Sequence, residues 1–73
     1  MNMRIEFCQL SDFLPEAQEI VNFLEKKLRT DINMAPSQSF GVFDVFCDDM
    51  LIFSRSEMQR LPLDGEEILE LLC

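Results

Sequence analysis

Basic residues are scarce in this sequence. Its 73 residues include only six Lys and Arg against fourteen Asp and Glu, and the formal net charge at pH 7 is -8. Proteins that bind nucleic acid contact its phosphates through clustered Lys or Arg, whereas the basic residues here are scattered along the chain. We therefore predict that the protein binds neither nucleic acid nor an anionic membrane surface.

Histidine is absent, and the three cysteines, Cys8, Cys47 and Cys73, do not have the spacing of a zinc finger. Three thiols cannot all pair within one chain, and in a reducing cytosol they would remain free. No apolar run approaches the ~20 residues that a membrane span needs, and the N-terminus lacks a signal-peptide pattern. These absences predict a cytoplasmic protein with free thiols, no metal and no bound cofactor.

Apolar residues, by contrast, are abundant. They make up 48% of the chain and include seven Phe, which is sufficient for one compact core and argues against disorder. A chain of this length buries only ~60% of the surface that it exposes when unfolded, so its stability should be modest. We expect a single domain over residues 1–73.

The first half of the sequence predicts a strand followed by a helix. Residues 3–7 alternate between apolar and charged side chains, which is typical of a strand with one buried face. From Leu14 apolar residues recur every three or four positions, which predicts an amphipathic helix. The start of this helix is open, because either Ser11 or Asp12 could cap it and Pro15 is tolerated in a first turn. The predicted buried positions of the helix are Leu14, Ala17, Val21, Leu24 and Leu28, flanked by Ile20 and Phe23.

The second half predicts three strands and a helix. Residues 31–35 could form a short strand, and residues 36–39 read as a loop. Residues 40–47 and 50–54 are rich in aromatic and β-branched residues around Asp48-Asp49, which indicates a hairpin closed by two residues. The segment from Asp64 to Glu67 matches a capping box, and it predicts a final helix that buries Ile68, Leu71 and Leu72.

The order of elements is therefore β-α-β-β-β-α. It predicts an α/β fold of two layers, an α+β sandwich in which a four-stranded mixed sheet carries both helices on one face. The strand at 3–7 should lie parallel to 31–35 through a right-handed crossover and antiparallel to 40–47.

The hairpin register predicts which side chains face away from the helices. With a two-residue turn, Cys47 pairs with Met50, Val45 with Ile52 and Phe43 with Ser54 on the helix side. Phe46 with Leu51, and Asp44 with Phe53, then lie on the open face, unless the register slips by one residue. Exposed apolar patches often mark an interface, so we expect Phe46, Leu51 and Phe53 to contact a partner protein or a second copy of the chain.

The segment Cys8-Gln-Leu-Ser11 places a thiol between the first strand and the first helix, in a loop where we expect its sulfur to be at least partly accessible. Backbone N–H groups and the positive end of a helix dipole stabilise a thiolate at such a junction. Ser11 occupies the fourth position of a C-x-x-C motif, and a hydroxyl cannot close a disulfide. Cys8 and Ser11 are the candidate catalytic residues, with Ser11 able to donate a hydrogen bond to the thiolate. The alternative is that Cys8 is a partly buried small side chain and Ser11 only a helix cap.

Five segments carry a further signal: Phe7-Cys8-x-x-Ser11-Asp-Phe-Leu-Pro-Glu-Ala17, Gly41-Val-Phe-Asp-Val-Phe46, Leu51-Ile-Phe-Ser-Arg55, Arg60-Leu-Pro62 and Gly65-Glu-Glu-Ile68. In their order and spacing they resemble the Rdx family, the selenoprotein W, T and H type of small thioredoxin-like proteins. The resemblance implies a thioredoxin-like fold, a cytosolic thiol redox role, reaction with glutathione and association with partner proteins.

Two residues depart from the family pattern. Ser11 stands in place of the second Cys, and Glu16 stands where the family usually has Arg. Nearby carboxylates raise the pKa of a thiol, so these departures bear on activity more than on fold. With one motif thiol, the implied chemistry is a monothiol cycle in which glutathione resolves a mixed disulfide. The alternative is a non-catalytic protein-interaction module on the same fold.

Overall fold

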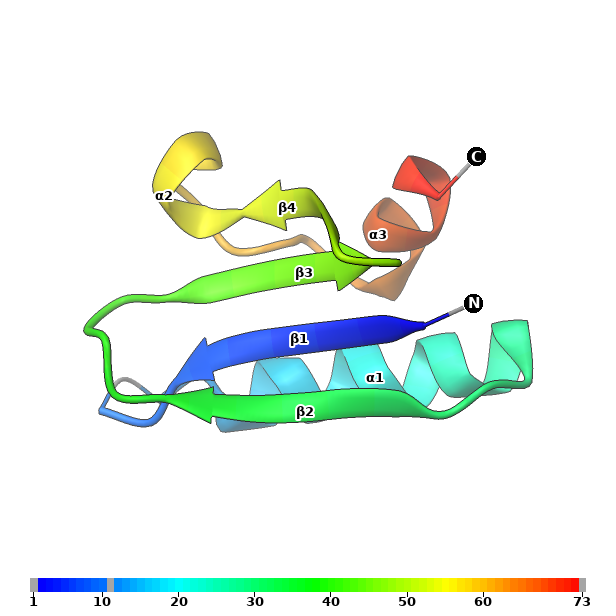
Figure 1. The fold of residues 1–73 in the computed structure, drawn as a ribbon, viewed down its shortest axis with the longest axis horizontal. Helices are drawn as coiled ribbons and strands as arrows, with labels where there is room; N and C mark the ends of the chain where they lie inside the picture. Colours follow the sequence, from blue (N-terminus) through cyan, green and yellow to red (C-terminus); the bar gives the residue numbers. More distant parts are fainter. Residues whose placement is uncertain (1, 11, 73) are drawn as a thin grey trace.

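The computed structural model describes residues 2–10 and 12–72, which form one sheet and three helices (Figure 1). The strands are β1 (Met3–Cys8), β2 (Ile32–Ser37), β3 (Phe43–Cys47) and β4 (Met50–Ser54). The helices are α1 (Leu14–Leu28), α2 (Arg55–Met58) and α3 (Gly65–Leu71).

The sheet has the predicted topology. Its strand order is β2-β1-β3-β4, with β1 parallel to β2 and antiparallel to β3 (Figure 1). Met3, Ile5 and Phe7 of β1 are buried as their alternation predicted. β1 extends one residue beyond the predicted strand, and β2 reaches Ser37, so part of the predicted loop at 36–39 is sheet.

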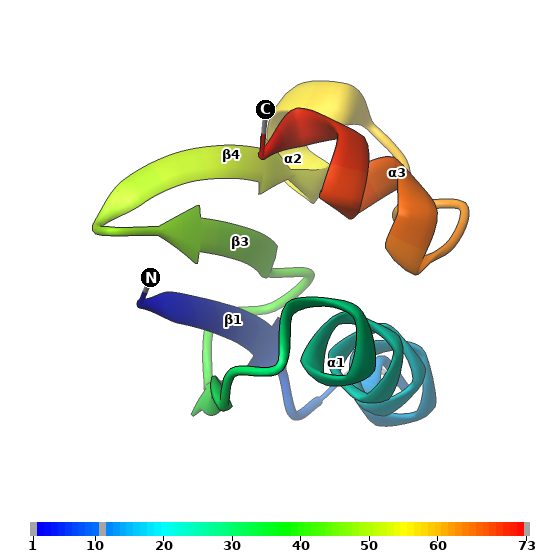
Figure 2. The ribbon, with the colours of Figure 1, turned by 90° about the vertical axis from the view of Figure 1, so that its right-hand side faces the viewer.

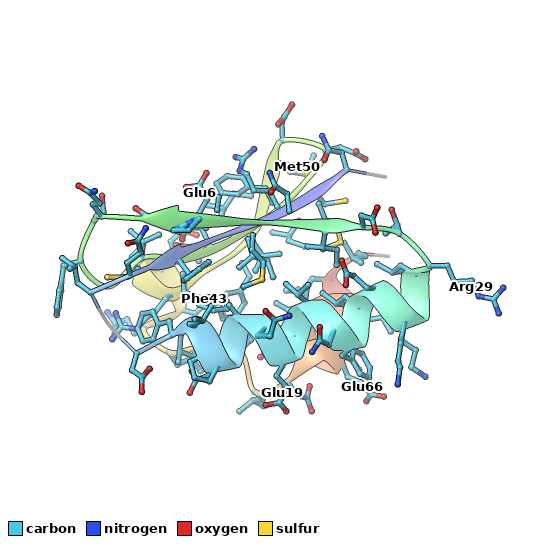
Figure 3. All side chains as sticks on the ribbon, turned by 90° about the horizontal axis from the view of Figure 1, so that it is seen from below. Glu6, Glu19, Arg29, Phe43, Met50 and Glu66 are labelled. Carbon is cyan, nitrogen blue, oxygen red and sulfur yellow. The ribbon has the colours of Figure 1, made fainter. Side chains whose placement is uncertain are left out.

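All three helices lie on the same side of the sheet (Figure 2). Two of them, α1 and α3, were predicted, whereas the four-residue α2 directly after β4 was not. The face of the sheet opposite the helices carries Glu6 (Figure 3). The fold is thus the predicted two-layer α+β arrangement.

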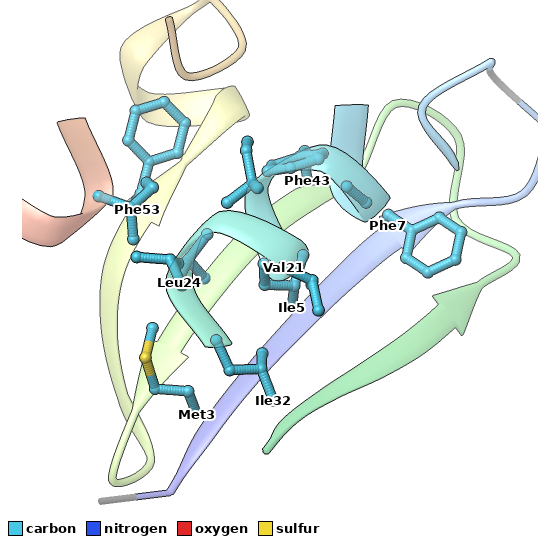
Figure 4. Close-up of a cluster of buried hydrophobic side chains, with 12 residues drawn as sticks. Met3, Ile5, Phe7, Val21, Leu24, Ile32, Phe43 and Phe53 are labelled. Atoms are coloured by element: carbon cyan, nitrogen blue, oxygen red, sulfur yellow. The ribbon is translucent and has the colours of Figure 1, made fainter. Parts of the chain in front are cut away.

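The core lies between α1 and the sheet. Ala17, Ile20, Val21 and Leu24 of α1 are buried, and Figure 4 shows Val21 and Leu24 beside Ile5 of β1. These positions match the predicted stripe except at its start. Leu14 is 53% exposed, so its predicted burial is wrong; as the first residue of α1 it lines an open pocket at the end of the sheet.

The β3–β4 hairpin has the predicted two-residue turn, Asp48-Asp49. Asp48 and Asp49 both have positive φ, 52° and 66°, as a two-residue hairpin turn of the I′ type requires. The Asp48 N–H donates to the carbonyl oxygen of Asn2 at 2.7 Å, and the Asn2 N–H donates to Asp48 Oδ1 at 2.9 Å. These bonds hold the strained turn against the start of β1. β3 itself starts at Phe43 rather than at the predicted residue 40.

The register changes along this hairpin. Cys47 pairs with Met50 and Phe46 with Leu51, as predicted. Beyond that point Val45 pairs with Phe53 and Asp44 with Ser54, because a bulge leaves one extra residue, Ile52, on β4. The predicted pairs Val45–Ile52, Phe43–Ser54 and Asp44–Phe53 are therefore wrong.

The bulge moves Phe53 to the helix side of the sheet. Its side chain is 3% exposed and belongs to the core cluster, so the predicted place of Phe53 on the open face is wrong. Ile52 also contacts the core and shares a pocket of about 220 Å³ with Cys47 and the last turn of α3. An added residue thus lets two consecutive apolar side chains of β4 face the core.

The last helix starts at the predicted cap. The Asp64 side chain accepts a hydrogen bond from the Glu67 N–H at 3.1 Å. Ile68 is buried and Leu72 is half-buried against the core. Leu71, however, is largely exposed, so its predicted burial is wrong; it lies in the last turn, at the margin of the core.

Candidate functional site

Cys8 is the last residue of β1 and is held by the sheet on both sides. Its N–H donates to the carbonyl oxygen of Val42 at 2.8 Å, and the next N–H, of Gln9, donates to the carbonyl oxygen of Ser37 at 3.0 Å. The Cys8 residue is 0% exposed. The prediction of a partly accessible Cys8 in a loop is therefore wrong, because pairing with the segments on either side extends the strand through Cys8.

An open pocket of about 460 Å³ lies at this end of β1. It is lined by Phe7, Cys8, Gln9, Asp12, Leu14 and Pro36. The walls are mainly apolar, with one carboxylate, and none of the described lining residues is basic. A substrate in this pocket would meet apolar surface beside the cysteine.

The first turn of α1 borders the same pocket through Leu14. The sequence left the start of α1 open. In the structure Phe13, rather than Asp12, is the cap residue, and it makes no side-chain capping bond. Pro15 lies in the first turn of the helix. Ser11, the other candidate cap and candidate catalytic residue, lies outside the described residues. Because Cys8 and Leu14 line one pocket, the cysteine lies at the N-terminal end of α1, where the helix dipole favours an anion.

A cation that the sequence analysis missed lies at this end of the sheet. The Arg55 Nη1 donates to the carbonyl oxygen of Gly41 at 3.4 Å, and its guanidinium lies 5.5 Å from the centroid of the Phe13 ring. The antiparallel hairpin could have revealed this, because the residue after β4 must lie beside the residues before β3. Arg55 thus contacts the two segments that lead to and from the Cys8 end of the sheet.

The second predicted site, on the open face of the sheet, is smaller than expected. Phe46 lies opposite Arg4, whose guanidinium is 4.3 Å from the ring centroid. Arg4 also forms ion pairs with Glu6 at 2.9 Å and with Asp49 at 3.7 Å. Leu51 is 42% exposed beside Phe46. The apolar part of this face is therefore Phe46, partly covered by Arg4, together with Leu51.

Cys47, the other described cysteine, lies apart from Cys8. Cys47 pairs with Met3 at the opposite end of β1 and is half-buried against the core, whereas Cys73 lies outside the described residues. Within residues 2–10 and 12–72, no group of three or more His, Cys, Asp or Glu side chains could hold a metal ion. None of the described helices is long and apolar enough to cross a membrane.

Comparison with known proteins gives one family match and similar solved structures. The sequence profile of the Rdx family matches residues 2–72, whereas a sequence comparison with curated proteins found no match. A selenoprotein W-related protein from Vibrio cholerae has a similar solved structure, with a TM-score of 0.88 and 15% identity, covering 97% of this chain and 90% of that chain. A protein from Bordetella parapertussis is similar to the same degree, with a TM-score of 0.88 and 15% identity over 97% of this chain and 91% of its own.

Proposed function

Because the chain belongs to the Rdx family, we propose that it is a small thiol redox protein that exchanges disulfides through one cysteine, Cys8. The observation that carries the proposal is the position of Cys8, at the end of β1 and in the wall of a pocket that the first turn of α1 also borders. A thiolate is favoured at the N-terminal end of a helix. We expect the protein to work in the reducing cytoplasm, where its thiols stay available.

The proposed cycle uses one protein thiol and an external one. The Cys8 thiolate attacks one sulfur of a disulfide R–S–S–R′, so that a Cys8–S–S–R bond forms and R′ leaves as a thiolate. The thiolate of glutathione then attacks the R sulfur, which forms R–S–S–glutathione and releases the Cys8 thiolate. Each step breaks one S–S bond and forms one, so sulfur oxidation states balance without a bound cofactor.

Ser11 defines this cycle as monothiol. In a C-x-x-C motif the second cysteine would attack the mixed disulfide from within the chain, and the Ser11 hydroxyl cannot form that bond. We assign Ser11 the role of hydrogen-bond donor to the Cys8 thiolate. An external thiol must therefore resolve the intermediate, and glutathione is the proposed one.

A specific observation favours a second candidate, a non-catalytic protein-interaction module. Cys8 is 0% exposed, so a disulfide can reach its sulfur only after the surrounding segments separate. Leu51 and Phe46, in contrast, lie on the sheet face opposite the three described helices. In this alternative, a partner protein or a second copy of the chain binds that face.

Reactivity of the individual cysteines separates the two candidates. The folded protein is incubated with glutathione disulfide near neutral pH, and the adducts are assigned to single cysteines by mass spectrometry of peptides. The matched variants are Cys8→Ser and the double variant Cys47→Ser/Cys73→Ser, which leaves only Cys8. The redox proposal expects an adduct on Cys8 in the wild type and the double variant. Adducts confined to Cys47 or Cys73 while Cys8 stays unmodified would favour the interaction module.

A further inference from the structure

We propose that Arg55 is a positioning residue that controls access to Cys8, an inference that rests on the proposed role of Cys8. Arg55 directly follows β4, at the sheet edge opposite β2. Its guanidinium reaches back to the carbonyl oxygen of Gly41, at 3.4 Å, and to the face of Phe13, at 5.5 Å. One half-buried side chain thereby links the segment before α1 to the segment before β3.

Both of these segments border Cys8. Phe13 ends the connection that starts from Cys8, and Gly41 precedes Val42, whose carbonyl oxygen accepts the Cys8 N–H at 2.8 Å. Figure 1 shows the two connections at the same end of the sheet. Because Cys8 is 0% exposed, a reagent can reach its sulfur only when neighbouring segments move away, and these two are next to it. Movement of either segment would break a contact of Arg55, with Phe13 or with Gly41.

The contacts of Phe13 add to this arrangement. Its ring packs edge-to-face on Phe43 of β3, with centroids 6.1 Å apart and planes at 76°. Arg55 covers another part of the same ring. A guanidinium suits this position better than an ammonium group, because it is planar and presents several donors, so it can stack on a ring and donate to a carbonyl at the same time. Arg55→Lys should therefore preserve the charge but only part of the contact.

The inference predicts a selective increase in the reactivity of Cys8. When closing is faster than modification, the rate of alkylation follows the equilibrium population of the open state. Loss of one hydrogen bond and one cation–π contact should raise that population about three- to tenfold. The increase should appear in the plateau of the pH profile, above about pH 10, where a thiol with the ordinary pKa of about 8.5 is almost fully ionised.

Cys47 provides an internal reference for this test. It pairs with Met3, at the opposite end of β1 from Cys8, and is half-buried, so its rate calibrates the reagent. The free energy of unfolding of each variant, measured by urea denaturation, shows whether an increase at Cys8 comes from global unfolding rather than from a local opening near Arg55. Alkylation by iodoacetamide is followed at each cysteine by peptide mass spectrometry in a Cys73→Ser background. We expect Arg55→Gln to raise the Cys8/Cys47 rate ratio about three- to tenfold. Arg55→Lys should give a ratio between those of the wild type and Arg55→Gln.

Arg60→Gln is the matched control. Arg60 also lies over an aromatic ring, that of Phe53, and forms an ion pair with Glu67. Its hydrogen bonds within the described part of the chain go to Leu61 and Glu67, not to the segments beside Cys8. Its loss should leave the ratio unchanged. A Cys8/Cys47 rate ratio that is unchanged or lower in both Arg55 variants on the plateau would overturn the inference. If the ratio were also lower below the plateau, Arg55 would instead stabilise the Cys8 thiolate through its charge. The proposed function fails separately, if wild-type Cys8 forms no disulfide with glutathione.

Discussion

Gly65, the first residue of α3, lies against Phe23 of α1, and replacing it should destabilise the protein through that one side chain. A Cβ atom at this position would lie 2.4 Å from Cδ1, 2.8 Å from Cγ and 3.0 Å from Cβ of Phe23. Because the Cβ and Cγ atoms are involved, rotation of the ring alone cannot relieve the overlap. The whole Phe23 side chain, or the α3 backbone, must shift.

Two effects of Gly65→Ala oppose each other. Alanine in place of glycine favours a helix by roughly 0.5–1 kcal/mol, whereas forced overpacking typically costs about 1–3 kcal/mol. Because a Cβ atom would overlap three atoms near the base of the Phe23 side chain, we expect an overpacking cost in the upper part of its range. We therefore expect a net loss of about 1–2 kcal/mol in the free energy of unfolding.

A double-mutant cycle measured by urea denaturation isolates the cause. In a Phe23→Ala background the overlapping ring atoms are absent, so Gly65→Ala should become neutral or stabilise by up to about 0.5 kcal/mol. The reasoning would be refuted if Gly65→Ala destabilised both backgrounds equally, or if it stabilised the protein when Phe23 is present. The first result would point to the backbone of Gly65 rather than to its contact with Phe23.

Two further predictions follow from α3 and β4. The Arg60 guanidinium and the Leu63 N–H both donate to the Glu67 carboxylate and hold its pKa at about 2, below its ordinary value. Because the folded pKa is lowered, the stabilisation is complete above the unfolded pKa of about 4.3 and is lost as the pH falls through 2. In thermal denaturation, Glu67→Gln should thus cost about 1 kcal/mol at pH 7 for this partly exposed pair and only a small part of that near pH 2. An equal loss at both pH values would contradict this prediction. On β4, Phe53→Ala should cost about 3–5 kcal/mol in urea denaturation and Leu51→Ala less than about 1 kcal/mol; similar losses would contradict the bulge.

Local sequence patterns predicted the elements that depend on their own residues. The alternation of Met3, Ile5 and Phe7 defines the buried face of β1 without reference to other strands. The start of α3 was equally predictable, because Asp64 and Glu67 form a local cap whose hydrogen bond involves only adjacent turns. In both cases the information lies within a few residues of the structure that it specifies.

The bulge in β4 could not be predicted in the same way. Met50, Leu51, Ile52 and Phe53 are consecutive apolar residues, so no polar alternation indicates which of them faces the core. The register is then decided by packing against helices that are distant in sequence. The inward position of Phe53 is a consequence of the fold, and the apolar patch predicted on the open face lost its third member as a result.

The burial of Cys8 likewise depends on residues far along the chain. Its place at the strand-to-helix junction was evident from the sequence, but its inclusion in the sheet depends on Val42 and Ser37, whose carbonyl oxygens accept hydrogen bonds from the Cys8 and Gln9 N–H groups past the expected end of β1. The contact of Arg55 with Gly41 is similarly a product of the hairpin. A short motif could therefore identify the candidate thiol but not the access to it.

The central claim is that Cys8 alone supports thiol-disulfide exchange, and the most direct test is turnover with glutathione. Reduction of a small neutral disulfide, bis(2-hydroxyethyl) disulfide, by glutathione is followed through NADPH consumption with glutathione reductase present. We predict that the wild type and Cys47→Ser/Cys73→Ser accelerate the reaction equally, and that folded Cys8→Ser gives only the rate without protein. Undiminished acceleration by Cys8→Ser, or no acceleration by the folded wild type, would contradict the account.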